Sequence, residues 1–348
     1  MSETDVRRID PHDPDPNLLH EAAAIIRRGG LVAFPTETVY GLGANATDAD
    51  AVTRIYQAKN RPASDPVIVH IAAIDMLAGV AVDIPDDAIR LARAFWAGAL
   101  TLVLKRHPDI PPIVSAGTDT VAVRMPGHPV ALGLIAAAGV PIAAPSANTF
   151  SRPSPTTAQH VLDDLAGRID MILDGGATPI GLESTIIDMT GDPVILRPGG
   201  VPLEAVRAIV PGVGIRAKYL NVEQTADAPG QMIKHYSPRA QLILFDGQPD
   251  AVIARMQAEA RLRVENGQTV GILTRNQERG AFDTLPARVI ALGADPETIG
   301  AALFAAIRDL DRSGVDAILV RGFEREGIGL AIWDRLVRAA EGRVIHVE

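Results

Sequence analysis

Hydroxyl and cationic side chains gather in four short segments of the 348-residue sequence, and each segment also contains Gly or Pro. The segments are 35–43, 59–66, 145–156 and 174–199. Three of them begin where a short apolar run ends, and α/β sheets place their ligand-binding loops after strands. Hydroxyls combined with Lys and Arg suit the binding of a nucleotide together with a small polar substrate.

The segment 59–66 holds two cations, Lys59 and Arg61, followed by Pro62. These cations could hold adjacent phosphates, because Arg presents a planar fork of donors and Lys a point charge. The alternative is a solvated helix end, where cations are favoured without any ligand. As loop-end charges, we expect them to contribute only about 0–1 kcal/mol to stability.

The other segments follow predicted strands. In 35–43, two hydroxyls and the glycines Gly41 and Gly43 would let backbone amides approach a ligand, or would form a tight turn capped by Thr. In 145–156, Ser146 and Asn148 suit phosphate or ribose binding, although hydroxyls here also suit the cap of a helix starting near residue 157. Arg197, before Pro-Gly, is either a phosphate contact or a surface ion pair.

Composition excludes several classes of protein. There is no cysteine, which excludes disulfides, cysteine nucleophiles and thiolate metal sites. The formal net charge of −9 and the 4% aromatic content argue against general nucleic-acid binding. The Walker phosphate loop, the dinucleotide-binding glycine motif, the zinc-protease motif and the nucleophile elbow are absent. We find no signal peptide and no apolar run long enough for a membrane helix, and expect a cytoplasmic protein with no membrane association.

Periodicity indicates two α/β regions. Over residues 1–210 we predict helices at 18–28, 50–59, 88–96, 130–138 and 157–165, and strands at 31–34, 67–71, 100–104, 121–123, 141–144, 171–173, 185–187 and 194–196. Residues 211–240 have scattered Gly and Pro and are interpreted as a linker or lid. Residues 241–348 alternate strands (242–245, 270–274, 289–292, 317–320) with helices (251–264, 297–310, 331–340), which favours a small parallel sheet.

Five motifs in fixed order resemble the YrdC-like domain of threonylcarbamoyl-AMP synthases. They are PTETVYGLG (35–43), KNRP with PVIVHI (59–71), APSAN with SPT (144–156), DGG with GLESTIID (174–188) and ILRPG (195–199). The segments GQM and HYSP at 230–238 and GIGLAI at 327–332 resemble the long, two-domain form. The resemblance implies a twisted mixed-sheet YrdC-like catalytic domain (1–210), a linker (211–240) and a smaller Rossmann-like C-terminal domain (241–348).

The resemblance also implies an activity. Such enzymes are nucleotidyltransferases that make L-threonylcarbamoyladenylate from L-threonine, bicarbonate or CO₂, and ATP, and release pyrophosphate. The product feeds the threonylcarbamoyl modification of tRNA through a separate transferase, so stable nucleic-acid binding is not expected. Mg²⁺ would arrive on the phosphates of ATP, with no metal site made by the protein alone.

Site residues follow from the same resemblance. Lys59 and Arg61 would be catalytic. Contacts to ATP would come from Arg61, Asp65, Thr120, Ser146, Asn148, Ser154, Arg197 and Tyr236. L-Threonine would be held by Thr36, Thr38, His70, Arg124, Ala144 and Ser184. The motifs contain no strong general base, so catalysis would rest on positioning and on charge stabilisation.

Three alternatives stay open. The chain could be an RNA-binding YrdC-like module without adenylate synthesis. It could be a carbamoyltransferase of the hydrogenase-maturation type, although the zinc fingers of that class need cysteine. The C-terminal region could have a separate ligand or a regulatory role. For Tyr236, the alternatives are a contact to the nucleotide within a lid, or burial of the ring within a passive linker.

Overall fold

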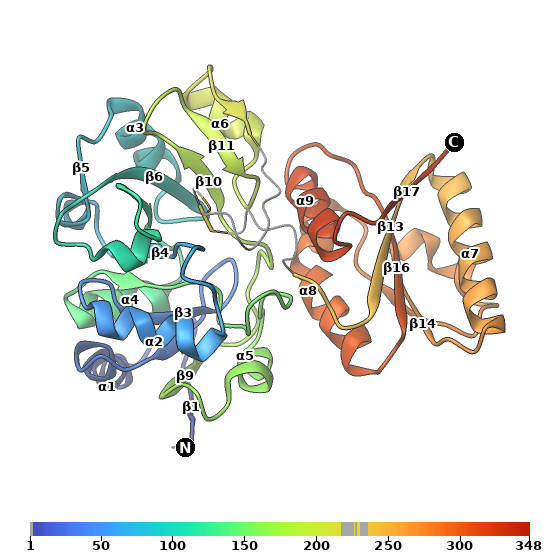
Figure 1. Ribbon diagram of the computed structural model, residues 1–348, viewed down its shortest axis with the longest axis horizontal. Coiled ribbons are helices and arrows are strands. Elements are labelled where there is room, and N and C mark those ends of the chain that lie inside the picture. Colours follow the sequence, from blue (N-terminus) through green and yellow to red (C-terminus); the bar gives the residue numbers. More distant parts are fainter. Residues whose placement is uncertain (1–2, 217–225, 227, 230–235) are drawn as a thin grey trace. The chain divides into compact units, whose positions relative to one another are not determined.

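A computed structural model describes residues 3–216, 226, 228–229 and 236–348 (Figure 1). The chain divides into two compact units, Met1–Phe150 with Ser154–Met232, and Ser151–Pro153 with Ile233–Glu348. The expected boundaries at 210 and 240 stay predictions, because much of the intervening linker, including Met232, Lys234 and His235, lies outside the described residues.

The first unit is a mixed α/β domain. Its α-helices are α1 (Pro16–Arg27), α2 (Ala49–Lys59), α3 (Asp86–Phe95), α4 (Pro129–Ala138), α5 (Ala158–Leu165) and α6 (Leu203–Ile209), with 3₁₀ turns at Ile74–Gly79 and Pro112–Ser115. Its strands are β1 (Asp5–Arg8), β2 (Val32–Phe34), β3 (Gly41–Asn45), β4 (Ile68–His70), β5 (Ala81–Val82), β6 (Leu100–Arg106), β7 (Thr120–Arg124), β8 (Ile142–Ala143), β9 (Met171–Asp174), β10 (Thr185–Asp188), β11 (Val194–Arg197) and β12 (Gly214–Ile215).

These strands form one twelve-stranded sheet. Its order is β1-β9-β2-β3-β8-β4-β7-β6-β10-β11-β12, and β5 pairs with β6. The pairing is mixed: β4 and β7 are parallel, whereas β7 and β6 are antiparallel. The expected mixed sheet is therefore confirmed.

Alternation along the central strands separates a core face from a second face. Val69, Leu102 and Val123 join the large apolar cluster that also contains α2 and α3. The alternate positions on the same strands carry His70, Thr101 and Arg124 together with a small apolar cluster. The polar site residues therefore lie on the face of the sheet that points away from the large core.

Gly41 and Gly43 are strand residues, and the expected turn of segment 35–43 is capped by Thr36, whose Oγ1 accepts from the N–H groups of Thr38 and Val39. Both glycines lie in β3, beneath the ring of Phe34 from the neighbouring strand β2. A Cβ on Gly43 would stand 2.7 Å from the Phe34 ring and 2.9 Å from Ile142. Gly43 is needed because the Phe34 ring and Ile142 leave no room for a side chain there, whereas a Cβ on Gly41 would make only ordinary contacts.

The second unit is built on a parallel five-stranded sheet of order β15-β14-β16-β13-β17. Its elements are β13 (Gln241–Gly247), α7 (Pro249–Glu265), β14 (Val270–Thr274), a 3₁₀ turn (Asn276–Phe282), β15 (Arg288–Ala291), α8 (Pro296–Arg312), β16 (Ala317–Arg321), α9 (Gly329–Ala339) and β17 (Val344–Val347). Within this unit, Arg152 pairs with Asp311 at 2.9 Å. The expected Rossmann-like parallel domain is confirmed.

Each predicted helix and strand is present, with ends that differ by a few residues at most. Six strands and helices among the described residues were not predicted, namely β1, β3, β5, α6, β12 and β17, and neither were the three 3₁₀ turns. No helix in the described part of the chain combines the length and apolarity that crossing a membrane requires.

Candidate functional site

Four neighbouring strands bring site residues to one edge of the large sheet. Arg124 pairs with His70 on one side and with Thr101 on the other. Ser184 directly precedes β10, which runs parallel to β6 with Thr185 opposite Leu100. Strands β4 and β7 therefore end where β6 and β10 begin, and their polar side chains meet there.

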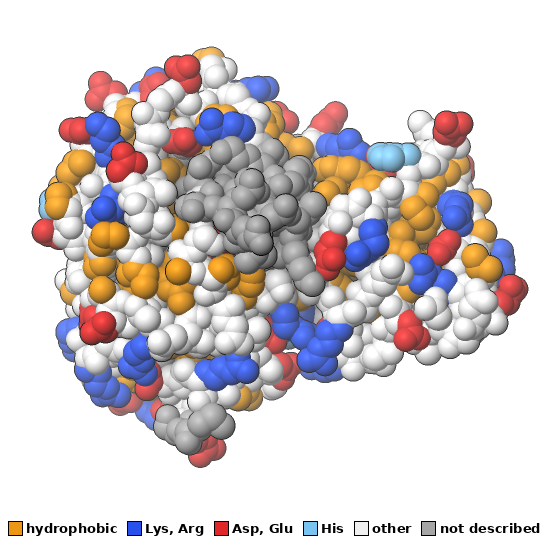
Figure 2. All heavy atoms as spheres, viewed as in Figure 1, with side chains coloured by type: hydrophobic (Ala, Val, Ile, Leu, Met, Phe, Trp, Pro, Cys, Tyr) orange, Lys and Arg blue, Asp and Glu red, His pale blue; other side chains and the backbone are white. Residues whose placement is uncertain are grey.

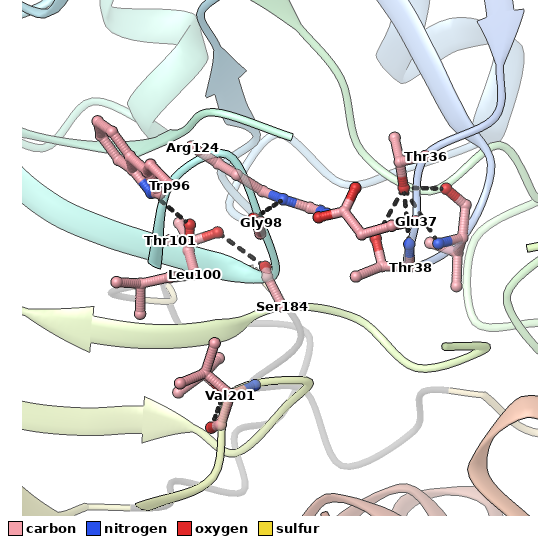
Figure 3. A network of polar contacts seen from close by, with 12 residues as sticks. Thr36, Glu37, Thr38, Trp96, Gly98, Leu100, Thr101, Arg124, Ser184 and Val201 are labelled. Atoms are coloured by element: carbon pink, nitrogen blue, oxygen red, sulfur yellow. Dashed lines mark hydrogen bonds and ion pairs between the residues drawn. The ribbon is translucent and has the colours of Figure 1, made fainter. Parts of the chain in front are cut away.

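Arg124 and Glu37 form a buried ion pair at this edge. Arg124 Nη2 lies 2.6 Å from Glu37 Oε1, and the two side chains are 5% and 14% exposed. Arg124 Nε donates to the backbone oxygen of Gly98 at 3.2 Å. Figure 3 shows Arg124 and Glu37 pointing toward each other from β7 and from the loop after β2. The guanidinium is thus held in one orientation by two acceptors.

Thr36 and Thr38 flank Glu37 and stiffen its loop. Their hydroxyls lie 2.8 Å apart, and Thr36 Oγ1 also donates to the backbone oxygen of Val39 at 2.6 Å. The backbone N–H groups of Thr38 and Val39 both donate to Thr36 Oγ1. Thr36 is therefore an internal brace of the loop, whereas Thr38 lies in it fully buried.

Ser184 belongs to a second cluster of hydrogen bonds. Its hydroxyl lies 2.7 Å from that of Thr101, and its backbone oxygen accepts from Arg197 Nη2 at 2.9 Å. The adjacent residue, Glu183, accepts from Ser154 Oγ at 2.5 Å. The structure therefore brings together Ser154, Ser184 and Arg197, three residues that the sequence motifs predict. Arg197 is 4% exposed, so the alternative of a surface ion pair is wrong.

Lys59 holds the loop that carries Ser146 and Asn148. Its ammonium donates to the backbone oxygens of both residues at 2.5 Å each. Asn60 adopts the left-handed conformation (φ 52°) and ends α2 directly after Lys59. The same loop contacts the segment 35–43, because Ser146 forms a β-bridge with Gly41 and Ala147 N donates to Tyr40 O.

Arg61 and Asp65 form a buried ion pair of 2.9 Å with side chains 3% and 0% exposed. Arg61 also donates to the backbone oxygens of Asp65 and Pro66. Lys59 is 1% exposed. The expectation of solvated loop-end charges is therefore wrong for Lys59 and Arg61, because the turn around Pro62 folds them inward.

His70 is an uncharged histidine in the core of the site. It is 3% exposed and meets the ring of Phe34 edge-on at 6.5 Å. Burial, and to a smaller extent the neighbouring charge of Arg124, lowers the pKa of His70 to about 3. Its Nδ1 has no hydrogen-bond partner among the described residues.

This burial predicts an acid-sensitive fold. The folded state binds the His70 proton less tightly than the unfolded state, so stability rises with pH between about 3 and 6.5 and is fully present above 6.5. From pH 7 to pH 5, the contribution of His70 falls by about 2 kcal/mol. Urea unfolding at both pH values should show this loss in the wild type and not in His70→Gln. Equal losses in both proteins would contradict a neutral buried His70.

The remaining predicted residues lie in three places. Ala144 continues β8 and its N–H donates to Ile68 O. Thr120 lies at the opposite end of β7 from Arg124, with its hydroxyl 3.1 Å from that of Thr118. Tyr236 lies in the second unit, fully buried against Phe304 at 5.2 Å between ring centroids and under the guanidinium of Arg335. A contact from Tyr236 to ATP stays a prediction.

Parts of the expected linker pack on the first unit. Ala226 N donates to Ser64 O, next to the Arg61–Asp65 pair. Ala228 is buried with Ile68, Ala122 and Ile186 on the face of the sheet that carries the site. Pro229 O accepts from Arg197 Nη1 at 3.2 Å. These contacts place Pro229 directly beside Arg197 and Ala226 beside Ser64, in the same turn as Arg61.

Three residues of the site were not singled out from the sequence. Glu37 lies inside the motif 35–43, where the neighbouring hydroxyls of Thr36 and Thr38 give the stronger signal for a ligand. Thr101 is the only hydroxyl in the apolar run 100–104, and this is its only signal in the sequence. Glu183 shares a motif with Ser184, and only the fold reveals that it accepts from Ser154.

A second group of buried charges lies in α9 of the second unit, where Asp334 pairs with Arg335 at 2.6 Å and with Arg338 at 3.1 Å. On the face shown in Figure 2, acidic and basic side chains are interspersed. Within the described ranges, no three His, Asp or Glu side chains come close enough together to hold a metal ion.

Comparisons with known proteins cover nearly the whole chain. A family model described as "Telomere recombination" matches residues 24–199, and "Threonylcarbamoyl-AMP synthase, C-terminal domain" matches 201–341. The threonylcarbamoyl-AMP synthase of Pyrococcus abyssi is 48% identical over 94% of this chain and 95% of its own. That of Bacillus subtilis is 45% identical over 95% of both chains. The crystal structure of P. abyssi Sua5 complexed with L-threonine superimposes with a TM-score of 0.94, at 44% identity, over 99% of this chain and 100% of that one.

Proposed function

Since the chain belongs to the threonylcarbamoyl-AMP synthase family, we propose that it makes L-threonylcarbamoyladenylate from L-threonine, bicarbonate or CO₂, and ATP, with release of pyrophosphate. The main support is structural. Arg124, Ser184 and the loop held by Lys59 follow or lie on separate strands, and they meet on one face of the sheet. This arrangement supports a site for two substrates, because cationic and hydroxyl groups are gathered around it.

The amino-acid end of the site is proposed around Arg124. Its guanidinium is fixed by Gly98 and Glu37, and Nη1 has no hydrogen-bond partner among the described residues. A fixed guanidinium with open donors suits a carboxylate. Thr38, His70 and Ser184 are buried around this edge and would enclose the threonine side chain and exclude water.

The nucleotide end is proposed around Arg61, Ser146, Asn148, Ser154 and Arg197. Lys59 fixes the Ser146–Asn148 loop through two carbonyl oxygens, and Asp65 fixes the guanidinium of Arg61. Preorganised cations of this kind stabilise charge that develops in a transition state. ATP would enter with Mg²⁺ on its phosphates.

The proposed reaction has two steps. The amine of threonine adds to CO₂ and loses a proton, which gives a carbamate. An oxygen of the carbamate then attacks the α-phosphorus of ATP, and the bond to pyrophosphate breaks. The role of this chain is to bring both substrates together and to keep water from the labile adenylate. A separate transferase would carry the product to tRNA.

The assignment is tested by product analysis. The purified chain is incubated with ATP, bicarbonate and L-threonine, and pyrophosphate and the adenylate are measured with each substrate omitted in turn. We expect both products only when all three substrates are present. Release of ADP and phosphate at a rate indifferent to threonine would contradict the proposal.

A further inference from the structure

Glu37 is held in a rigid loop and aimed at the proposed threonine site. Its backbone oxygen accepts from Ile180 N at 3.0 Å, and the braced hydroxyl of Thr36 fixes the turn on both sides of it. A Cβ added to Gly127 would lie 3.6 Å from the Glu37 carboxyl carbon, so the chain after β7 also closes over it. Its side chain has little freedom to point elsewhere.

Only half of the Glu37 carboxylate is satisfied. Oε1 pairs with Arg124 Nη2 at 2.6 Å (Figure 3). Oε2 is buried and has no hydrogen-bond partner among the described residues. Buried carboxylate oxygens without partners are rare in native proteins, because desolvation of a charge is costly. We therefore expect Oε2 to accept a hydrogen bond from a ligand or to contact a cationic group of a ligand.

Arg124 and Glu37 each have one charged group that could still bind a ligand, and the two groups have opposite charges. Arg124 offers Nη1 to an anion, and Glu37 offers Oε2 to a cation, at the two ends of one ion pair. An α-amino acid carries a carboxylate and an ammonium on the same carbon, and so matches this pair. Resting on the proposed function, we propose that Glu37 binds the α-ammonium of the amino-acid substrate and accepts its proton before carbamate formation.

The proton transfer balances as follows. One N–H bond of the ammonium breaks and an O–H bond forms at Oε2, which leaves a neutral amine beside a neutral carboxyl group. The freed electron pair on nitrogen then bonds to the carbon of CO₂. A second proton leaves the nitrogen for solvent, which gives the carbamate. Glu37 returns its proton to solvent when the product departs.

The competing explanation is that Glu37 only orients Arg124. Both explanations expect Glu37→Gln to weaken threonine binding, but they differ for a ligand without an ammonium group. The 2-hydroxy analogue of threonine keeps the carboxylate and the side chain and replaces the ammonium by a hydroxyl. A residue that only orients Arg124 would affect both ligands equally, because both have the carboxylate.

Calorimetric titration of the full chain with each ligand tests the proposal. The wild type should bind L-threonine at least about 10-fold more tightly than the 2-hydroxy analogue. Glu37→Gln should bind threonine about 10- to 100-fold more weakly, as for loss of one charged hydrogen-bond partner, and the analogue within about 3-fold of the wild type. Glu21→Gln, which changes an exposed carboxylate paired with Arg7, is the matched control and should alter neither affinity.

Equal weakening for both ligands, or none, in Glu37→Gln would overturn the proposal. If that variant fails to fold, the two affinities of the wild type test the proposal by themselves. Equal affinity of the wild type for threonine and its 2-hydroxy analogue would also overturn the proposal. If the proposal for Glu37 is wrong, the wild type should still synthesise pyrophosphate and the adenylate. Failure of the proposed function would instead appear as no threonine-dependent pyrophosphate from the wild type.

Discussion

Arg61→Ala should lower turnover by at least about 10²-fold and also cost about 3–5 kcal/mol of folding stability. The first effect is that expected for a lost stabiliser of transition-state charge. The second arises because Asp65, whose side chain is fully buried, would lose its partner at 2.9 Å. Removal of one member of a buried pair takes compensation from a buried charge, which is far more costly than loss of a surface pair. Urea unfolding and initial rates at matched folded protein concentration measure the two effects.

A second variant separates the role of Arg61 in chemistry from its role in folding. Arg61→Ala with Asp65→Ala removes both charges, so much of the lost stability should return while turnover stays low. Lys105→Ala, at an exposed ion pair with Asp83, should change neither quantity. If the double variant regained wild-type turnover together with its stability, Arg61 would act through the fold alone.

The sequence was a good guide to elements with strong periodicity. Helix α2 is predicted to within a residue because its apolar residues recur at helical spacing and Lys59 and Asn60 end it. Strand β3 is not predicted because its glycines favour a turn, and only the ring of Phe34 from the adjacent strand explains Gly43. Strand β1 is exposed on most residues, so its sequence carries little apolar signal, whereas β17 is a four-residue edge strand that is mostly half-buried.

The sequence predicts which residues belong to the site better than it predicts what each residue does there. The motifs named Lys59, but its contacts with two carbonyl oxygens depend on how the 144–156 segment folds back against α2. Burial of Arg61 could not be inferred from charges beside proline in a turn. Glu37 needed the structure most, because its partner Arg124 is 87 residues away along the chain. Such pairs are set by strand order, which no local pattern encodes.

Arg124→Lys should raise the KM for threonine by about 10- to 100-fold and leave the KM for ATP within about 3-fold. Lysine preserves the positive charge beside Glu37, so the fold should survive the change. It does not preserve the planar fork, through which Arg124 reaches Gly98 and Glu37 and still has Nη1 for a ligand. A single ammonium must choose between Glu37 and the substrate carboxylate, and loss of a charged hydrogen bond accounts for the expected factor.

The split between the two KM values decides where Arg124 acts. Initial rates are measured against threonine at saturating ATP, and against ATP at the highest attainable threonine. Arg90→Lys is the matched control, because Arg90 forms an exposed ion pair with Asp87 and the substitution should change neither value. A KM for ATP that rises as much as the KM for threonine would place Arg124 at the nucleotide, since a residue confined to the amino-acid end has no means of weakening ATP selectively.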